Sequence, residues 1–236
     1  MKRIVYFLLS LSIGLPAVAK QEPYLPPVPS RPMLQPILEG ATPVRQRFAG
    51  DTTTTAKIFK LRTGQVYIES DMDIDADGSP RALEIDPGPG QLETSLTYED
   101  DRPVNSERVP YFVLPSGFFQ KFNIRLGDIG AVIYRGKVTY AIFADVGPSD
   151  LTGEGSLALH EALGHNPWED SSRSRILNES IPDGVVYVVF PGSGDGTPQT
   201  PARISAVGAK LWKTLLRDSS PMIGVRAESG AAMIAR

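Results

Sequence analysis

Cysteine is absent from the 236 residues of this chain. Its absence excludes catalysis by a thiol, metal sites built from thiolates and a small fold stapled by disulfides. It also excludes the lipid-modified cysteine that anchors many exported proteins to a membrane. The chemistry of the chain therefore has to come from other side chains.

A long hydrophobic run is absent too. The N-terminal apolar segment covers only residues 4–15, whereas a helix that spans a bilayer needs about 20 residues. Two basic residues precede this segment, and Ala17-Val18-Ala19 follows it as a small-residue cleavage site. We predict a signal peptide over residues 1–19 and a secreted protein, extracellular or periplasmic, with no membrane contact after cleavage. An uncleaved anchor is the alternative.

The chain has no basic stripe that could hold nucleic acid. Its formal charge of −3 becomes −5 once Lys2 and Arg3 are removed with the signal peptide. Residues 71–101 contain ten Asp or Glu and a single basic residue, Arg81. This balance argues against a nucleic-acid partner and favours a cationic one.

Proline is concentrated near the N-terminus, where residues 20–50 contain seven. Such a segment shows little periodicity and buries little apolar surface, so we predict a linker or extended arm over residues 20–52. One globular domain is predicted over residues 53–217, followed by a C-terminal tail over 218–236. We expect a monomer.

Short apolar or alternating runs between turn residues predict β-strands in that domain. Arg135-Gly136-Lys137 predicts a hairpin turn, and helices are predicted over Ser156–Leu163 and Pro201–Leu216. The predicted fold class is mainly β, a small antiparallel or mixed barrel resembling a double-psi β-barrel, with two peripheral helices. The predicted strands cover Ala56–Leu61, Gln65–Glu69, Tyr111–Leu114, Gly130–Tyr134, Val138–Phe143 and Gly184–Phe190.

Two carboxylates stand out in the segment YAIFADVGPSDLTGEGSLAL, residues 140–159. Asp145 follows an apolar strand, and Glu154 comes nine residues later at the expected start of a helix. Hydrolysis of a glycosidic bond needs two such groups, one to protonate the leaving oxygen and one to activate water or attack directly. The alternative is a solvated turn residue and a glutamate placed by the helix dipole.

A second acidic motif, DMDIDADG, covers residues 71–78. From Asp73 it matches the pattern of a calcium-binding loop with Glu84 in the last position, but the preceding residues predict a strand and Pro80 does not fit. Three interpretations stay open: a subsite for a cationic sugar, a bound calcium ion and a solvated loop. We favour the first and expect no metal and no cofactor. The aspartates of the motif are Asp71, Asp73, Asp75 and Asp77.

The only histidines, His160 and His165, flank a sequence with one residue too many for the zinc-protease motif H-E-x-x-H. On a helix, positions i and i+5 lie about 140° apart, so we expect that the two imidazoles cannot both face one metal ion. A zinc site is not predicted. The motif G-x-S-x-G of serine hydrolases is also missing.

Five collinear segments between residues 65 and 216 resemble glycoside hydrolase family 75, the fungal-type chitosanases. They are DMDIDADG, VPYFVLP, LGDIGAVIYRGK, YAIFADVGPSDLTGEGSLAL and VVYVVFPGSGDG. The resemblance implies an endo-acting, inverting enzyme that cleaves partly or fully deacetylated chitosan. It implies that the two essential acids are Asp145 and Glu154. The chain departs from the family in its Pro-rich arm and in lacking the cysteine of the D-C-D-G version of residues 75–78.

The segment around Asp145 and Glu154 is also similar to murein transglycosylases with double-psi barrels, in which the second acid donates the proton. By that similarity Glu154 is the general acid. We then expect Asp145 to act as the base, and the four aspartates of residues 71–77 and Tyr111 to bind the substrate. Both catalytic acids should face one groove, with Asp73 or Asp75 on its wall. Two other functions stay open: a non-catalytic polysaccharide-binding module, and a hydrolase of another amino-sugar polymer such as peptidoglycan.

Overall fold

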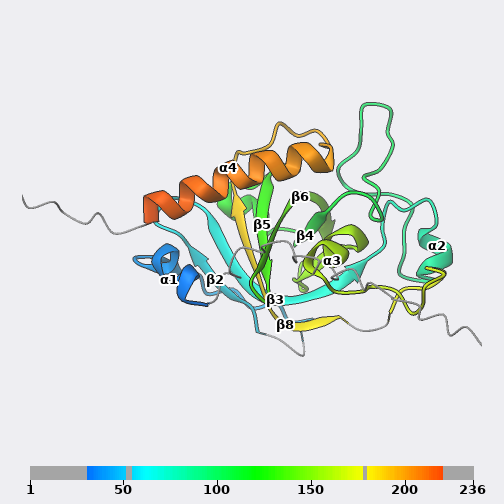
Figure 1. The fold of residues 1–236 in the computed structure, drawn as a ribbon, viewed down its shortest axis with the longest axis horizontal. Coiled ribbons are helices and arrows are strands. Elements are labelled where there is room, and N and C mark those ends of the chain that lie inside the picture. The colour runs from blue at the N-terminus through cyan, green and yellow to red at the C-terminus, as the bar shows by residue number, and fades with distance from the viewer. Residues whose placement is uncertain (1–30, 52–54, 178–179, 220–236) are drawn as a thin grey trace, which may run out of the picture.

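The computed structural model describes residues 31–51, 55–177 and 180–219 (Figure 1). The predicted signal peptide lies outside these ranges, as does most of the predicted C-terminal tail. None of the helices within these ranges combines the length and the apolar character that a membrane span requires.

Six strands close into a barrel, and two short strands extend its sheet (Figure 1). Around the barrel the order is β3–β7–β4–β6–β5–β8, and β8 closes the ring by pairing with β3. The predicted fold class is thereby confirmed. The barrel strands are β3 (Val66–Asp75), β4 (Tyr111–Pro115), β5 (Ile129–Tyr134), β6 (Lys137–Gly147), β7 (Glu154–Ser156) and β8 (Ile181–Phe190).

The β5–β6 hairpin forms where the sequence predicts it. Tyr134 pairs with Lys137, so Arg135 and Gly136 alone make the turn. Both have positive φ, 45° and 77°, as a two-residue type I′ turn requires. The hairpin continues into antiparallel pairing of β5 with β8 and of β8 with β3.

The other half of the barrel depends on parallel pairing. Strand β3 pairs in parallel with β7, and β4 pairs in parallel with β6. Between these two pairs, β7 lies antiparallel to β4. The three residues of β7 come from the stretch predicted to lead directly into a helix, so this strand was not predicted.

The long helix α4 (Pro201–Ser219) covers one side of the barrel and contacts β5 and β6. Its buried residues face the sheet, and a Cβ at Gly208 would come within 2.5 Å of the Tyr140 ring, so the helix and β6 approach closely here. Thr200 caps the helix, with its hydroxyl accepting from Arg203 N at 3.3 Å. Ile204, Trp212 and Leu215 of this helix are buried against the barrel.

Shorter helices lie at other points of the barrel. Helix α3 (Leu157–Leu163) begins after Ser156, whose hydroxyl accepts from Leu159 N. Helix α2 (Ala82–Ile85) and the 3₁₀-helix η1 (Phe119–Phe122) lie in connections. Neither was predicted.

Residues 31–51 are not a detached arm. Helix α1 (Arg31–Leu38) contacts α4, strand β1 (Thr42–Pro43) pairs with β2 (Lys57–Lys60), and Phe48 packs in the main core. Over the described residues 31–51 the chain is therefore packed rather than extended, because a few apolar side chains spaced between the prolines are enough to dock it. The domain boundary at residue 53 stays a prediction.

Candidate functional site

The strand register brings three acids onto one row of the barrel. Asp73 of β3 pairs with Glu154 of β7, Glu154 pairs with Val113 of β4, and Val113 pairs with Asp145 of β6. Residues paired across neighbouring strands project from the same face of a sheet. Glu154 and Asp145 therefore stand on either side of Val113, on the same face.

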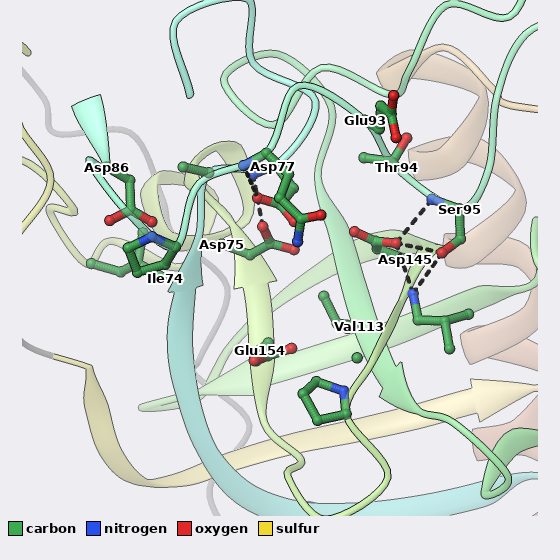
Figure 2. A pocket seen from close by; sticks show the side chains of 16 residues that line it. Ile74, Asp75, Asp77, Asp86, Glu93, Thr94, Ser95, Val113, Asp145 and Glu154 are labelled. Carbon is green, nitrogen blue, oxygen red and sulfur yellow. Dashed lines mark hydrogen bonds between the residues drawn. The ribbon is translucent and has the colours of Figure 1, made fainter. Parts of the chain in front are cut away.

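A groove of about 490 Å³ opens over this row (Figure 2). Both predicted catalytic acids line it. Among the described residues that form its wall there is no Lys, Arg or His, so the groove is strongly acidic. Its six acidic side chains are Asp75, Asp77, Asp86, Glu93, Asp145 and Glu154.

Glu154 is placed so that its carboxyl keeps a proton. The side chain is largely buried, and a Cβ added at Gly147 would lie only 2.9 Å from Glu154 Oε2, so only a glycine fits there without a shift. Burial, followed by the nearby charges of Asp73 and Asp145, raises the pKa of Glu154 to about 7. A carboxylic acid of this kind can donate a proton near neutral pH.

Asp145 is held differently, by three hydrogen bonds to a single oxygen (Figure 2). Its Oδ1 accepts from Ser95 N at 2.9 Å, from Ser95 Oγ at 2.6 Å and from Val146 N at 2.8 Å. These donors fix the orientation of the carboxylate at the groove wall. Sequence analysis missed Ser95, since a serine in an irregular connection carries no signal for this contact.

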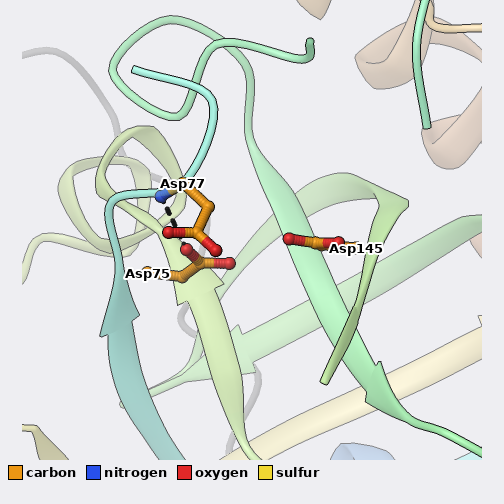
Figure 3. A group of neighbouring side chains, drawn as sticks. All are labelled: Asp75, Asp77 and Asp145. Atoms are coloured by element: carbon orange, nitrogen blue, oxygen red, sulfur yellow. Dashed lines mark hydrogen bonds between the residues drawn. The ribbon is translucent and has the colours of Figure 1, made fainter. Parts of the chain in front are cut away.

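Asp75 and Asp77 lie beside Asp145, and oxygens of the three carboxylates are all within 4.8 Å of one another (Figure 3). Asp75 Oδ1 accepts from Asp77 N at 2.8 Å, and Asp77 Oδ1 accepts from Gln91 N at 2.7 Å. Burial raises the pKa of Asp77 to about 6, and burial together with the charge of Asp77 raises the pKa of Asp75 well above its usual value. A cation beside these two carboxyl groups would favour their ionised forms.

The other predicted substrate-binding residues lie off the groove wall. Asp71 is buried and accepts from Ser70 Oγ at 2.7 Å. Asp73 lies on the far side of Glu154 and accepts from Ser180 Oγ. Tyr111 is fully buried, and its hydroxyl donates to the Asp77 carbonyl at 2.9 Å, so its ring is not exposed to a ligand.

The residues of the calcium-loop pattern are not arranged as one loop. Strand β3 continues through Asp73 to Asp75, and Glu84 is exposed on α2, away from the groove lining. The acids that do come together are Asp75, Asp77 and Asp145, from two distant segments. A cluster of carboxylates does not by itself define a metal site.

The two imidazoles lie closer together than a separation of 140° on one continuous helix would allow. Helix α3 ends at Leu163, and Gly164 in the left-handed conformation turns the chain back, so that His165 N donates to His160 O. The two Nδ1 atoms are 2.9 Å apart, and His160 Nε2 is 3.1 Å from the Asp73 carbonyl. Because a carbonyl only accepts, His160 carries its proton on Nε2, and His165 donates from Nδ1.

Two groove acids, Asp86 and Glu93, were not named as site residues, although both fall within the acidic stretch 71–101. That excess of acid is the signal that could have found them. Their approach to Asp77 depends on the fold of the irregular chain between α2 and β4, which local patterns do not encode.

Comparison with known families identifies a match over most of the described domain. The family described as fungal chitosanase of glycosyl hydrolase group 75 matches residues 72–220. This range holds every acid of the groove wall and covers more than half of the chain. A comparison of the chain with curated proteins gives no match.

Proposed function

Because this chain belongs to the fungal chitosanases of glycosyl hydrolase group 75, a family of glycoside hydrolases that act on chitosan, we propose that it is a secreted, endo-acting and inverting chitosanase. The catalytic domain is residues 53–217, with the packed segment 31–51 attached to it. Secretion rests on the N-terminal sequence, residues 1–19, and the endo mode of cleavage rests on the family resemblance.

The observation that carries this proposal is the row Glu154–Val113–Asp145. Two strand spacings separate the acids, which corresponds to about 9.5 Å between their Cα atoms. Inverting glycosidases have carboxyl groups about 6.5–9.5 Å apart, against about 5–5.5 Å in retaining ones, because a water must fit between the base and the sugar. The row thus places the two acids on one face with a strand between them, as the wider separation of the inverting class requires, and product stereochemistry tests that class.

In this mechanism Glu154 is the general acid. Its raised pKa keeps the carboxyl protonated near neutral pH, so it can donate the proton to the glycosidic oxygen as the bond to the leaving sugar breaks. Asp145 is the base. With Oδ1 held by Ser95 and Val146, its other oxygen is available to take a proton from the water that attacks the opposite face of the sugar.

The acidic wall explains the choice of a cationic polymer. An ammonium group of glucosamine would bind at Asp75 and Asp77, favouring their ionised forms and relieving the repulsion among neighbouring carboxylates. Asp73 would help to keep Glu154 protonated, since its charge raises the pKa of Glu154. Asp71 and Tyr111 would support the wall from beneath, Tyr111 through its bond to the Asp77 carbonyl.

A substrate panel with product stereochemistry tests the proposal. The protein is incubated with chitosan, chitin, cellulose and peptidoglycan, and the first products are examined by NMR and by chain length. We expect cleavage of chitosan, oligosaccharides of mixed length and initial release of the α-anomer. Initial β-anomer would contradict inversion, preferred cleavage of peptidoglycan would contradict the substrate, and binding without products would indicate a non-catalytic module.

A further inference from the structure

The loop before Glu154 is tied to a segment of the chain that precedes the family match. Gly50 N donates to the Asp150 carbonyl at 2.8 Å, and Thr152 N donates to Asp51 Oδ1 at 3.1 Å. Residues 150–153 lead directly into β7, whose first residue is Glu154. Hydrogen bonds with Gly50 and Asp51 therefore hold the 150–151 and 151–152 peptides of this loop.

The segment that makes these bonds is itself fixed to the barrel. Phe48 is buried, and its ring meets Phe118 edge to face with 5.7 Å between centroids. Nearby, Lys121 Nζ donates to Gln46 Oε1 at 3.0 Å. An anchored segment can hold a loop in place, whereas a freely moving one could not.

The loop is also confined by Asp71. Gly153 has a φ of +86°, and a Cβ at this position would collide with the Asp71 carboxylate and carbonyl. Residues 150–153 thus contact both Asp51 and Asp71. Their path fixes where β7 begins and which way the Glu154 side chain points.

The buried carboxylate of Asp51 lowers the stability of the folded state, so stability alone does not explain an aspartate at this position. Its Oδ2 is buried and makes no hydrogen bond to any described residue, and a buried carboxylate oxygen without a partner destabilises the folded state. An asparagine or serine could accept the same bond from Thr152 without a charge. The charge of Asp51 does act on the site, since it is one of the charges that raise the pKa of Glu154.

We propose that Asp51 is a positioning residue for the reaction, which holds the 150–153 loop so that Glu154 points at the glycosidic oxygen. The inference rests on Glu154 being the general acid, as proposed above. Asp51 touches neither sugar nor water in this role. It acts on the rate through the loop and on the protonation of Glu154 through its charge.

Two variants of Asp51, a variant of Gly50 and one control separate the effect of the loop from the effect of the charge. Asp51→Ala removes the bond to Thr152 and the charge, and we expect kcat on chitosan to fall by about 10- to 100-fold with little change in KM, since small misplacements of a catalytic group cost this much. Asp51→Asn keeps an acceptor for Thr152, and we expect it to retain most of kcat. Asp195→Ala is the control, because Asp195 likewise accepts from a backbone N–H, that of Thr197, but lies outside the groove.

The pH profile gives a readout that a purely structural role would not move. Removing a negative charge makes ionisation of Glu154 easier, so Asp51→Asn should shift the basic limb of the kcat profile to lower pH by about 0.3 units. Gly50→Ala provides a variant that removes no polar atom. Its Cβ would lie 2.6 Å from Leu151 Cδ2, so it should displace the loop and lower kcat as Asp51→Ala does.

Hydrogen exchange at the Thr152 amide, followed by NMR, is independent of activity. We expect faster exchange in Asp51→Ala than in the wild type or in Asp195→Ala. If the wild type cleaves chitosan but Asp51→Ala matches Asp195→Ala in kcat, pH profile and exchange, the positioning role is overturned. If the wild type cleaves no polysaccharide, the proposed function fails instead, and the exchange experiment still decides whether Asp51 holds the loop.

Discussion

The two sides of the barrel are built on opposite physical principles. Under α4, the strands present apolar side chains that pack with Trp212 and Leu215 and leave little surface exposed. On the groove side, the strands present carboxylates in a partly buried, acidic wall. Strand β6 belongs to both sides, since Tyr140 meets the helix and Asp145 lines the groove.

This division separates stability from chemistry. Burying a large apolar side chain stabilises a fold by about 1.5–3 kcal/mol, so the α4 side holds the barrel closed. Burying a carboxyl opposes folding once the group has to ionise. The groove side can keep its costly acids only because the opposite side stabilises the domain, and substitutions on the two sides should have opposite consequences.

The largest expected effect is on activity, from Glu154→Gln. This change keeps the shape of the side chain and removes the transferable proton, so the rate on chitosan should fall by about 10² to 10⁴-fold. Thermal stability should hold or rise, because an amide has no ionised form to desolvate. Glu84→Gln, an exposed position on α2, is the matched control and should cleave normally in a reducing-end assay. A near-normal rate in Glu154→Gln would remove it as the general acid.

On the opposite side, Trp212→Ala should act on stability alone. Trp212 is 6 % exposed and packs against the β5–β8 face, so truncation to alanine should destabilise the fold by about 3–5 kcal/mol. Its neighbour Lys213 is exposed, and Lys213→Ala should leave the denaturation midpoint within experimental scatter. At a temperature where Trp212→Ala is folded, its kcat should equal that of the wild type. A loss of kcat there would mean that the two sides are coupled.

The contribution of the groove side to the stability of the fold depends on pH. Burial raises the pKa of Glu154 from its usual 4.5 to about 7, so between these values the folded protein holds a proton that the unfolded chain does not. Stability from this group is complete below pH 4.5 and is lost as the pH rises through 7. Its loss amounts to about 3 kcal/mol.

The measurement compares wild type with Glu154→Gln, because His160 acts in the opposite sense. Burial lowers the pKa of His160 to about 4, so its contribution rises with pH and would mask the change in the wild type alone. In the difference between the two proteins His160 cancels. In urea titrations, the free energy of unfolding of Glu154→Gln relative to the wild type should be about 3 kcal/mol higher at pH 8 than at pH 4.5. If this difference is the same at both pH values, the pKa of the Glu154 carboxyl is not perturbed.

The two halves of the barrel also differ in how far sequence predicts them. The β5–β6 hairpin follows from local patterns, since alternation marks the strands and Arg135-Gly136 marks the turn. The pairs β3–β7 and β4–β6 are parallel and join distant segments, so no local pattern encodes them. β7 was missed for this reason, although its first residue, Glu154, was recognised.

Single residues account for the other differences between the predicted and the observed structure. Gly164 ends α3 early enough to bring the two histidines together, which a continuous helix would not allow. Leu34 and Ile37 dock α1 in spite of the prolines around them. Asp145 and Glu154 were predicted as site residues from family-like motifs, whereas Ser95 and Asp51 reach the site through contacts that only the folded chain creates.

The smallest expected effect is that of metal removal. Calcium takes six to eight oxygen ligands at about 2.3–2.6 Å, and the close acids Asp75, Asp77 and Asp145 each already direct an oxygen at a backbone N–H. We therefore expect EDTA to leave the melting temperature unchanged, whereas a glucosamine oligosaccharide should raise it by binding the native state. Asp77→Asn should weaken that rise, while Glu84→Gln should not. A melting temperature that falls with EDTA and recovers with calcium would show that the acidic wall binds a metal ion rather than the ammonium groups of the substrate.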